Sequence, residues 1–242
     1  MIRKLLGEPP RVNKGILLDA MNSMSAMLNL LERQIQADGD PTHDFRKVDI
    51  LTRGLMSSLD ELEQSHHASA FFRMKVKAGY AEDMSEDEKS DYALYVFFYK
   101  DGFVRVFSIL DKLGNWLNDL YDLKTGQYKA HYSYFTVLRQ LKYLKMHPVL
   151  TDNLNDIKDT YNDAINRLRK RRNTEIHYMN TEMQDDLWQR HRALYGKIQL
   201  EDLDHHLEDL QQGLEMVCRS LSNAFTYTAK QWENRAVRPK IR

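Results

Sequence analysis

The chain has 242 residues, and its 35 Lys and Arg balance its 35 Asp and Glu to a formal net charge of zero. Charged residues make up 29% and hydrophobic residues 42%, the balance of a globular protein with enough apolar side chains for a core. A net charge of zero excludes proteins that act by bulk charge, such as histone-like nucleic-acid coats, acidic disordered tails and polybasic membrane adaptors.

The cysteine content and the apolar runs exclude further classes. Cys218 is the only cysteine, so the chain has neither an internal disulfide nor a cysteine-rich zinc site, which favours a reducing compartment. The longest uncharged apolar run, Ala93 to Tyr99, is far shorter than the roughly 20 residues that cross a bilayer. The first ten residues contain no apolar stretch typical of a signal peptide. We therefore predict a cytoplasmic protein without a membrane segment.

Apolar residues at helical spacing follow almost the whole chain, and Gly and Pro, at 10 and 5, stand where helices should end. The predicted helices are 14–37, 45–78, 86–121, 128–146, 151–178, 181–194 and 200–232. The second is expected to break near Ser65–His67. Ser85 and Glu88 have the spacing of a capping box, and Thr151 is a candidate cap for the fifth helix. No segment alternates with period 2 between hairpin turns, so no sheet is predicted.

These elements predict an all-α fold, a multi-helix bundle with long antiparallel helices. The stretch 79–90 is the best candidate for an exposed connection. We divide the chain into an N-terminal helical extension (1–80), a main helical bundle (81–233) and a basic, disordered tail (234–242).

The sharpest local feature is the sequence RLRKRRNTEIHYMN, at the end of the fifth predicted helix. Five of the six residues 167–172 are basic, which by itself is typical of a solvated helix end. Arg172 and Asn173, followed by three residues and then His177, form an R-N-x-x-x-H pattern. In an all-helical chain this pattern resembles the signature of the HEPN superfamily, and residues 90–225 resemble a stand-alone bacterial HEPN bundle.

The resemblance implies a metal-independent endoribonuclease with a composite site between two protomers, and hence a homodimer, in stress or phage defence. It implies no cofactor, and RNA as the partner. The toxin-like branch of the family often carries a Tyr two residues after the His. Position 179 is Met here, so regulation through that Tyr is not inferred.

The residue types suit RNA cleavage on their own chemistry. Histidine exchanges protons near neutral pH, so His177 is the candidate acid and base. Arg172 can donate two hydrogen bonds to phosphate oxygens as negative charge develops, and Asn173 would orient either group. Arg169, Lys170 and Arg171 are candidate phosphate contacts.

Helical geometry places these residues on different faces. Asn173 and His177 lie about 40° apart, whereas Arg172 and His177 lie about 140° apart. Either the helix bends after Arg172, or the two side chains meet across a cleft, and the resemblance to the HEPN superfamily implies the cleft between two protomers. Arg172 continues an apolar stripe and should point inward, and the alternative to a catalytic role is that it pairs there with a buried acid such as Asp111. In that alternative the chain is a non-catalytic RNA-binding or protein-interaction bundle.

The charge is unevenly spread along the chain. Residues 124–178 contain 11 basic and 5 acidic residues, and residues 181–216 contain 3 basic and 9 acidic residues. The basic region suits a phosphate backbone, or else the two regions pair with each other. The acidic cluster Glu201–Asp209 includes two histidines, but we interpret it as a solvated first turn of a helix and predict no metal site.

Overall fold

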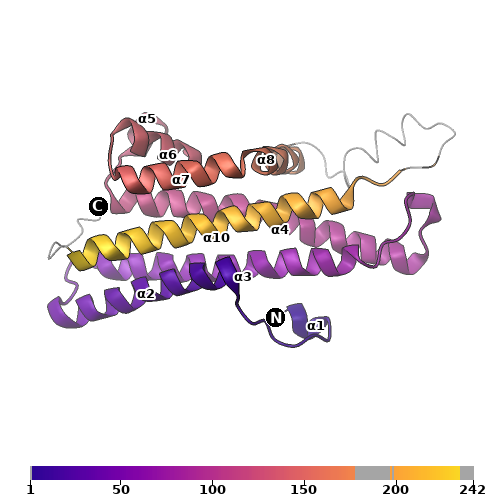
Figure 1. The fold of residues 1–242 in the computed structure, drawn as a ribbon, viewed down its shortest axis with the longest axis horizontal. Helices are drawn as coiled ribbons and strands as arrows, with labels where there is room; N and C mark the ends of the chain where they lie inside the picture. Colours follow the sequence, from indigo (N-terminus) through magenta and orange to yellow (C-terminus); the bar gives the residue numbers. More distant parts are fainter. Residues whose placement is uncertain (1, 178–196, 198, 235–242) are drawn as a thin grey trace. The chain divides into compact units, whose positions relative to one another are not determined.

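The computed structural model describes residues 2–177, 197 and 199–234, without the side chains of residues 38, 177 and 234. Within that part of the chain there are no strands, and an isolated bridge joins Tyr80 to Gln199. The predicted all-α fold is confirmed. The α-helices, labelled in Figure 1, are α1 (Ile2–Leu5), α2 (Gly15–Asp38), α3 (Asp44–Arg73), α4 (Glu86–Leu120), α5 (Thr125–Tyr128), α6 (Tyr134–Tyr143), α7 (Pro148–Thr160), α8 (Asn162–His177) and α10 (Leu203–Asn234), and a 3-10 helix, η1 (Ala81–Asp83), precedes α4.

The contacts divide the chain into two compact units. Unit 1 contains Met1–Arg11, Glu61–Val106 and Asn162–Leu214, and unit 2 contains Val12–Asp60, Phe107–Tyr161 and Glu215–Arg242. Helices α3, α4 and α10 contribute to both units. Neither unit ends at residue 80, so the division of the sequence at that position stays a prediction.

The long central helix α4 follows the sequence prediction closely. The amide of Glu88 donates to Oγ of Ser85 at 3.2 Å, and the Glu88 carboxylate reaches back to the Ser85 amide at 3.5 Å. The capping box is therefore present. The same carboxylate accepts hydrogen bonds from the backbone amides of Lys77 and Ala78. These two bonds lower the pKa of Glu88, and the bond from Lys77 has the larger effect. The start of α4 thus also holds the chain that follows α3.

The predicted break near Ser65–His67 is wrong, because α3 continues through these residues to Arg73. Ser65 donates to the carbonyl of Glu61 and also lies 2.5 Å from Oδ2 of Asp101. Nε2 of His67 pairs with the Glu8 carboxylate at 2.5 Å. The polar side chains find partners across unit 1 and leave the helical backbone bonds intact.

The predicted helix 128–146 is also wrong, since α5 and α6 are separate and α6 begins at Tyr134. The Tyr134 amide donates to Oδ1 of Asp111 at 2.9 Å, and its side chain is fully buried. A Cβ placed on Gly114 would lie 2.9 Å from Cα of Tyr134. This close approach draws the chain into unit 2 and interrupts the helix, which local spacing does not reveal.

The predicted helix 151–178 is two helices, which meet at Tyr161. Thr151 lies inside α7 and is not its cap, because Pro148 occupies the first turn and His147 precedes it in a left-handed conformation (φ 47°). The Tyr161 hydroxyl accepts from Nε of Arg219 at 2.9 Å and donates to Glu215 at 3.1 Å. These tertiary contacts hold Tyr161 outside both helices.

Helix α10 starts three residues later than predicted. The amide of Leu200 donates to the carbonyl of Gly79 at 3.0 Å, which keeps that segment extended beside residues 79–80. Oδ1 of Asp202 accepts from the amide of His205 at 2.9 Å and so caps the helix at Leu203. The predicted helix 181–194 and residues 235–242 of the predicted tail lie outside the described residues.

Candidate functional site

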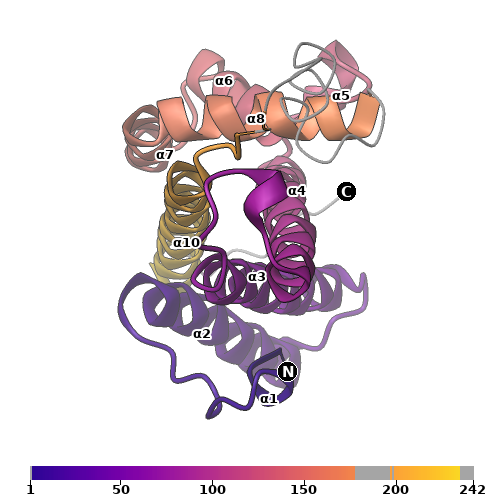
Figure 2. The same ribbon diagram turned by 90° about the vertical axis from the view of Figure 1, so that its right-hand side faces the viewer.

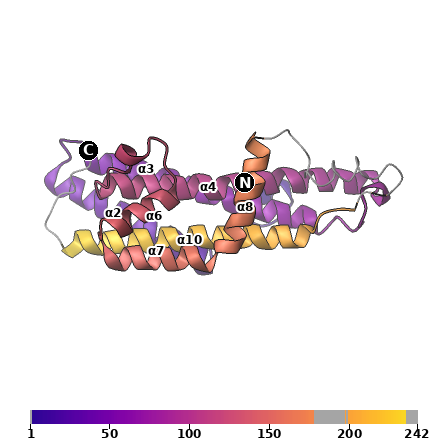
Figure 3. The same ribbon diagram turned by 90° about the horizontal axis from the view of Figure 1, so that it is seen from above.

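The R-N-x-x-x-H pattern occupies the last turns of α8, which lies across the unit 1 parts of α4 and α10 (Figures 2 and 3). Leu168 of α8 is fully buried. A Cβ on Gly213 of α10 would lie 2.9 Å from Cδ1 of Leu168 and 3.1 Å from Cγ2 of Val106. Gly213 therefore lets the three helices approach closely at this crossing.

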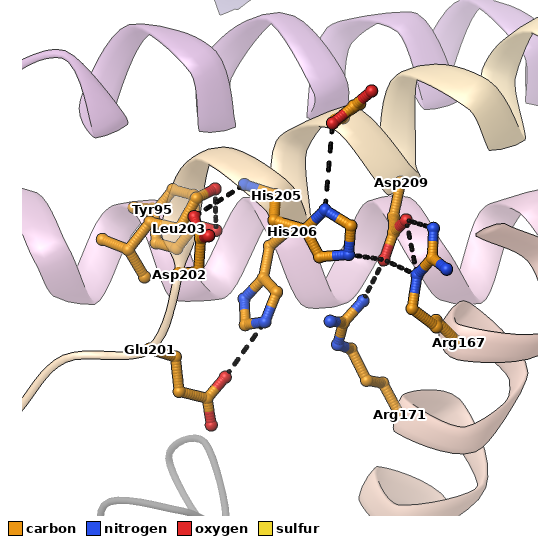
Figure 4. A network of polar contacts seen from close by, with 10 residues as sticks. Tyr95, Arg167, Arg171, Glu201, Asp202, Leu203, His205, His206 and Asp209 are labelled. Atoms are coloured by element: carbon orange, nitrogen blue, oxygen red, sulfur yellow. Dashed lines mark hydrogen bonds and ion pairs between the residues drawn. The ribbon is translucent and has the colours of Figure 1, made fainter.

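A buried carboxylate holds α8 to α10 (Figure 4). The Asp209 side chain has no exposed surface. Arg167 donates through Nε and Nη2 to Oδ1 at 3.0 and 2.7 Å, and Arg171 donates through Nη1 to Oδ2 at 2.7 Å. The two arginines are four residues apart and so share one face of α8. One acid of α10 thus binds two of the five basic residues of the run.

The negative charge of Asp209 is stabilised in its buried position by the two arginines. Burial by itself would raise the pKa of this carboxyl group, but the hydrogen bonds from Arg167 and then Arg171 outweigh it and hold the pKa below its ordinary value. Nε2 of His205 lies 4.0 Å from Oδ2, at the more exposed side of the cluster. The arrangement is a carboxylate buried together with its cations, as such groups require.

A second buried group lies beside this cluster. The ring of His206 stacks on that of Tyr99, with centroids 5.4 Å apart and planes 11° apart. Nε2 of His206 lies 3.2 Å from Oε2 of Glu201. Burial, and then the charge of Arg171, lower the pKa of His206 to about 4, so this histidine is neutral at pH 7 and donates to Glu201 through Nε2.

Two polar atoms of the stacked pair have no hydrogen-bond partner within the described part of the chain. They are Nδ1 of His206 and the hydroxyl of Tyr99. Burial also raises the pKa of Tyr99 well above its ordinary value, so the hydroxyl stays protonated. The neutral His206 leaves Nδ1 as an acceptor, and the protonated Tyr99 hydroxyl lies beside it as a polar group near Arg171 in the interior of unit 1.

Asn173 and His177 of the motif occupy the other side of α8, and Arg172 lies at the edge of its inward side. Arg172 is half-buried and donates through Nη2 to Oδ1 of Asn173 at 2.8 Å. Glu175 pairs with Lys100 of α4 at 2.9 Å, which ties the last turns of α8 to that helix. His177 is the last residue of α8, and its side chain lies outside the described part of the structure.

The three candidate phosphate contacts differ in their surroundings. Lys170 is exposed, and Arg169 is half-buried and donates to Oδ1 of Asn166 at 2.8 Å. Arg171 instead binds Asp209, so its charge is already matched inside the protein. Asp111, the acid suggested for Arg172, lies in unit 2 and accepts from the Tyr134 amide. The catalytic and phosphate-binding roles of these residues stay predictions.

The interpretation of Glu201–Asp209 as a solvated turn is wrong, because both His206 and Asp209 are buried. The sequence contained a usable signal: His206 and Asp209 fall on the helical stripe that begins at Leu203 and continues through Leu210. An acid on an apolar stripe requires a buried cation, and two arginines four residues apart could have supplied it.

The described residues contain no group of three or more His, Cys, Asp and Glu side chains arranged to hold a metal ion. In the same part of the chain, no helix combines the length and apolar character needed to span a membrane.

Comparison with family models adds a relationship over most of the chain. Residues 51–229 match the model of the Cthe2314-like HEPN family, and the match includes α8 with its motif and Asp209. Searches of curated proteins and of solved structures gave no match. Because the family model covers far more than half of the sequence, the chain belongs to the Cthe2314-like HEPN family.

Proposed function

We propose that this HEPN protein is a metal-independent endoribonuclease that works as a homodimer, with Arg172 and His177 as its reacting groups. The observation that carries the proposal is that the basic residues of α8 differ in their surroundings. Arg167 and Arg171 are bound to Asp209, whereas Lys170 is exposed and Arg172 and Asn173 remain partly exposed at the end that carries His177. A role in stress or phage defence, which family membership suggests, belongs to the same proposal.

The chemistry requires one proton shuttle and one stable positive charge. The imidazole of His177 accepts the proton of the RNA 2′-hydroxyl as its oxygen bonds to the adjacent phosphorus. The bond from phosphorus to the 5′-oxygen breaks, and the leaving oxygen takes a proton from an imidazolium. The guanidinium of Arg172 stabilises the added negative charge on the phosphorane. The products are a 2′,3′-cyclic phosphate and a 5′-hydroxyl, and no metal enters the scheme.

A row of uncharged side chains on α4 supports a homodimer. Leu94, Phe97 and Val104 are 41%, 64% and 38% exposed, and they lie on one side of the unit 1 part of α4. Lys100, within this stretch, is the residue that pairs with Glu175 of α8. A second copy that covers the row would therefore bring its own α8 motif close to the first.

The charges that flank this row favour a two-fold contact with an identical copy. Around the helix, Phe97 and Val104 have Lys100 with Glu175 on one side and Asp101 with Arg105, 2.6 Å apart, on the other side, where Leu94 also lies. A two-fold interface places each patch against itself in reversed order. Each of these two pairs contains one basic and one acidic side chain. In a two-fold contact, the basic residue of a pair can therefore face the acidic residue of the same pair in the second copy. This fits an identical copy better than a strongly charged partner.

The activity is tested with the purified full chain and single-stranded RNA in EDTA. We expect cleavage that leaves 2′,3′-cyclic phosphate ends, and loss of that cleavage in H177A and R172A. Asn162→Ala is the matched control, because Asn162 is exposed at the first turn of the same helix, away from the motif and from the basic run. Absence of cleavage by the wild type, or equal cleavage by H177A, contradicts the proposal. RNA binding without cleavage would support a non-catalytic RNA-binding bundle instead.

The shared site is tested by mixing two inactive variants. If Arg172 of one protomer acts with His177 of the other, a mixed dimer of R172A and H177A regains one intact site. Random exchange of subunits should then restore about one quarter of wild-type activity. No recovery after exchange contradicts a composite site.

The dimer surface is tested by light scattering. F97E places a charge in the uncharged row and should convert the dimer to a monomer. The control Y143E introduces the same charge at an aromatic residue of unit 2 that is 76% exposed, and should leave the dimer intact. If F97E remains a dimer, the dimer interface does not include the row on α4.

A further inference from the structure

Three independent contacts determine which face of α8 is turned toward unit 1. The first is the pair of arginines on Asp209, the second is Leu168 against Gly213, and the third is Glu175 with Lys100. Of these, only the Asp209 contact is formed by two residues of α8 with one buried carboxylate. It resists rotation of the helix about its own axis, because rotation would stretch one of the two arginine contacts.

Asn173 and His177 of the motif lie on the opposite side of the helix from these contacts, whereas Arg172 lies at the edge of the inward side, about 40° from Leu168. At about 100° per residue, Asn173 lies about 140° from Leu168, and position 177 lies about 180° from it. The exposed Lys170 and Asn166 belong to the same outward side. The inward contacts of α8 therefore define the direction in which the motif positions face.

We propose that Asp209 is a positioning residue of the nuclease site, acting through Arg167 and Arg171 to hold the rotation of α8 at which Arg172 and His177 meet their substrate. This inference rests on the function proposed above. It gives Arg171 a structural role in place of the phosphate contact predicted from the basic run. Nothing in the chemistry requires Asp209 to touch RNA, since its side chain is fully buried.

The size of the effect follows from the helix radius. A rotation of about 20° moves a side-chain end, at about 6 Å from the helix axis, by about 2 Å. A misplacement of about 1 Å at a reacting group can reduce the rate about 100-fold. Loss of the Asp209 charge leaves two guanidinium groups without their shared partner and should release the helix to rotate by such an amount.

The experiment compares D209N with a matched control, E63Q. Glu63 is also a nearly buried acid of unit 1 held by two arginines, with Arg3 at 2.5 Å and Arg11 at 2.8 Å, but neither arginine belongs to α8. Both substitutions remove a buried charge from a pair of arginines, so both should lower the melting temperature. We expect kcat for RNA cleavage to fall about 10-fold to 100-fold in D209N, with KM within about threefold of wild type. E63Q should keep the wild-type kcat.

A milder variant, R167K, keeps the inference testable if D209N does not fold. R167K keeps the positive charge but loses the paired donors of the guanidinium, and should lower kcat about threefold to tenfold at unchanged KM. A kcat in D209N and R167K equal to that of E63Q overturns the inference, as does a rise in KM with kcat unchanged.

A second measurement separates failure of this inference from failure of the proposed function. Amide hydrogen exchange of α8 should become faster in D209N and stay as in wild type in E63Q, whether or not the protein cleaves RNA. If the wild type is inactive and this difference appears, the nuclease proposal fails while the anchoring of α8 stands. If exchange of α8 is unchanged in D209N, the positioning role is wrong.

Discussion

Arg171 and Asp209 are 38 residues apart in the chain, and Nη1 of the arginine lies 2.7 Å from Oδ2 of the aspartate. The contact joins the basic run of α8 to the acidic start of α10. The two regions of opposite charge therefore meet in part inside unit 1. The pairing leaves Arg169, Lys170 and Arg172 as the members of the run that do not bind Asp209.

Replacement of Arg172 by lysine should lower kcat about 10-fold to 100-fold, because an ammonium group cannot donate two parallel hydrogen bonds to a phosphate. The measurement is single-turnover cleavage of a defined RNA at saturating protein. Arg139→Lys serves as the control, since Arg139 is exposed on α6 in unit 2. An Arg172→Lys variant as fast as wild type means that bidentate contact is not used.

Removal of Lys170 should weaken RNA binding about equally for all sequences, since an exposed cation contacts the backbone and not the bases. The plot of log affinity against log salt should lose a slope of about one. Filter binding with inactive H177A at several salt concentrations measures this slope. An unchanged slope places the RNA on another surface.

The buried His206 should make the protein less stable as the pH falls from about 6.5, the pKa of an unperturbed histidine. Its pKa is lowered to about 4 in the folded state by burial and by Arg171. The unfolded chain therefore takes up the proton first, and the free energy of unfolding drops across this interval by at most about 1.4 kcal/mol per pH unit.

Urea unfolding of wild type and His206→Phe between pH 7 and pH 4 tests this sign. Phenylalanine keeps a ring to stack on Tyr99 but removes the titrating group. The variant should show a smaller loss of stability over the interval. An equal loss in both proteins assigns the pH dependence to other groups.

Two glycines in long helices should respond oppositely to alanine. Gly114→Ala should destabilise the protein by about 1–3 kcal/mol, because the new Cβ would lie 2.9 Å from the backbone of Tyr134. Gly54→Ala on α3 meets nothing within 4 Å and should stabilise by up to about 1 kcal/mol through helix propensity. Chemical denaturation of both variants checks the pair, and a stable Gly114→Ala would contradict the close approach.

Cys218 should not react with a thiol reagent in the folded protein. Its side chain is buried, and burial raises its pKa to about 12, so little thiolate is present at pH 8. Ellman's reagent should label one thiol per chain in urea and none under native conditions. Rapid native labelling would mean that α10 opens locally at this residue.

Features that depend on neighbouring residues were predictable from the sequence. The capping box of Ser85 and Glu88 starts α4 because both partners lie within one turn. The all-helical fold and the position of the R-N-x-x-x-H pattern near a helix end follow from the same short-range periodicity. The assignment to HEPN proteins also rests on these local features, together with the family match.

Features that depend on residues far apart in the chain required the tertiary structure. Ser65 and His67 stay helical because Asp101 and Glu8 supply their partners, and Tyr134 ends a predicted helix because Asp111 and Gly114 draw it inward. No local pattern contains these contacts.

The zero net charge shows the same distinction. The sequence by itself determined that basic and acidic residues gather in separate stretches, since order along the chain is all that this requires. Only the tertiary structure decided which charges cancel, because a buried carboxylate such as Asp209 is stable only where folding brings cations to it. Arg167 and Arg171 are bound in this way, and the other three basic residues of the run do not bind Asp209.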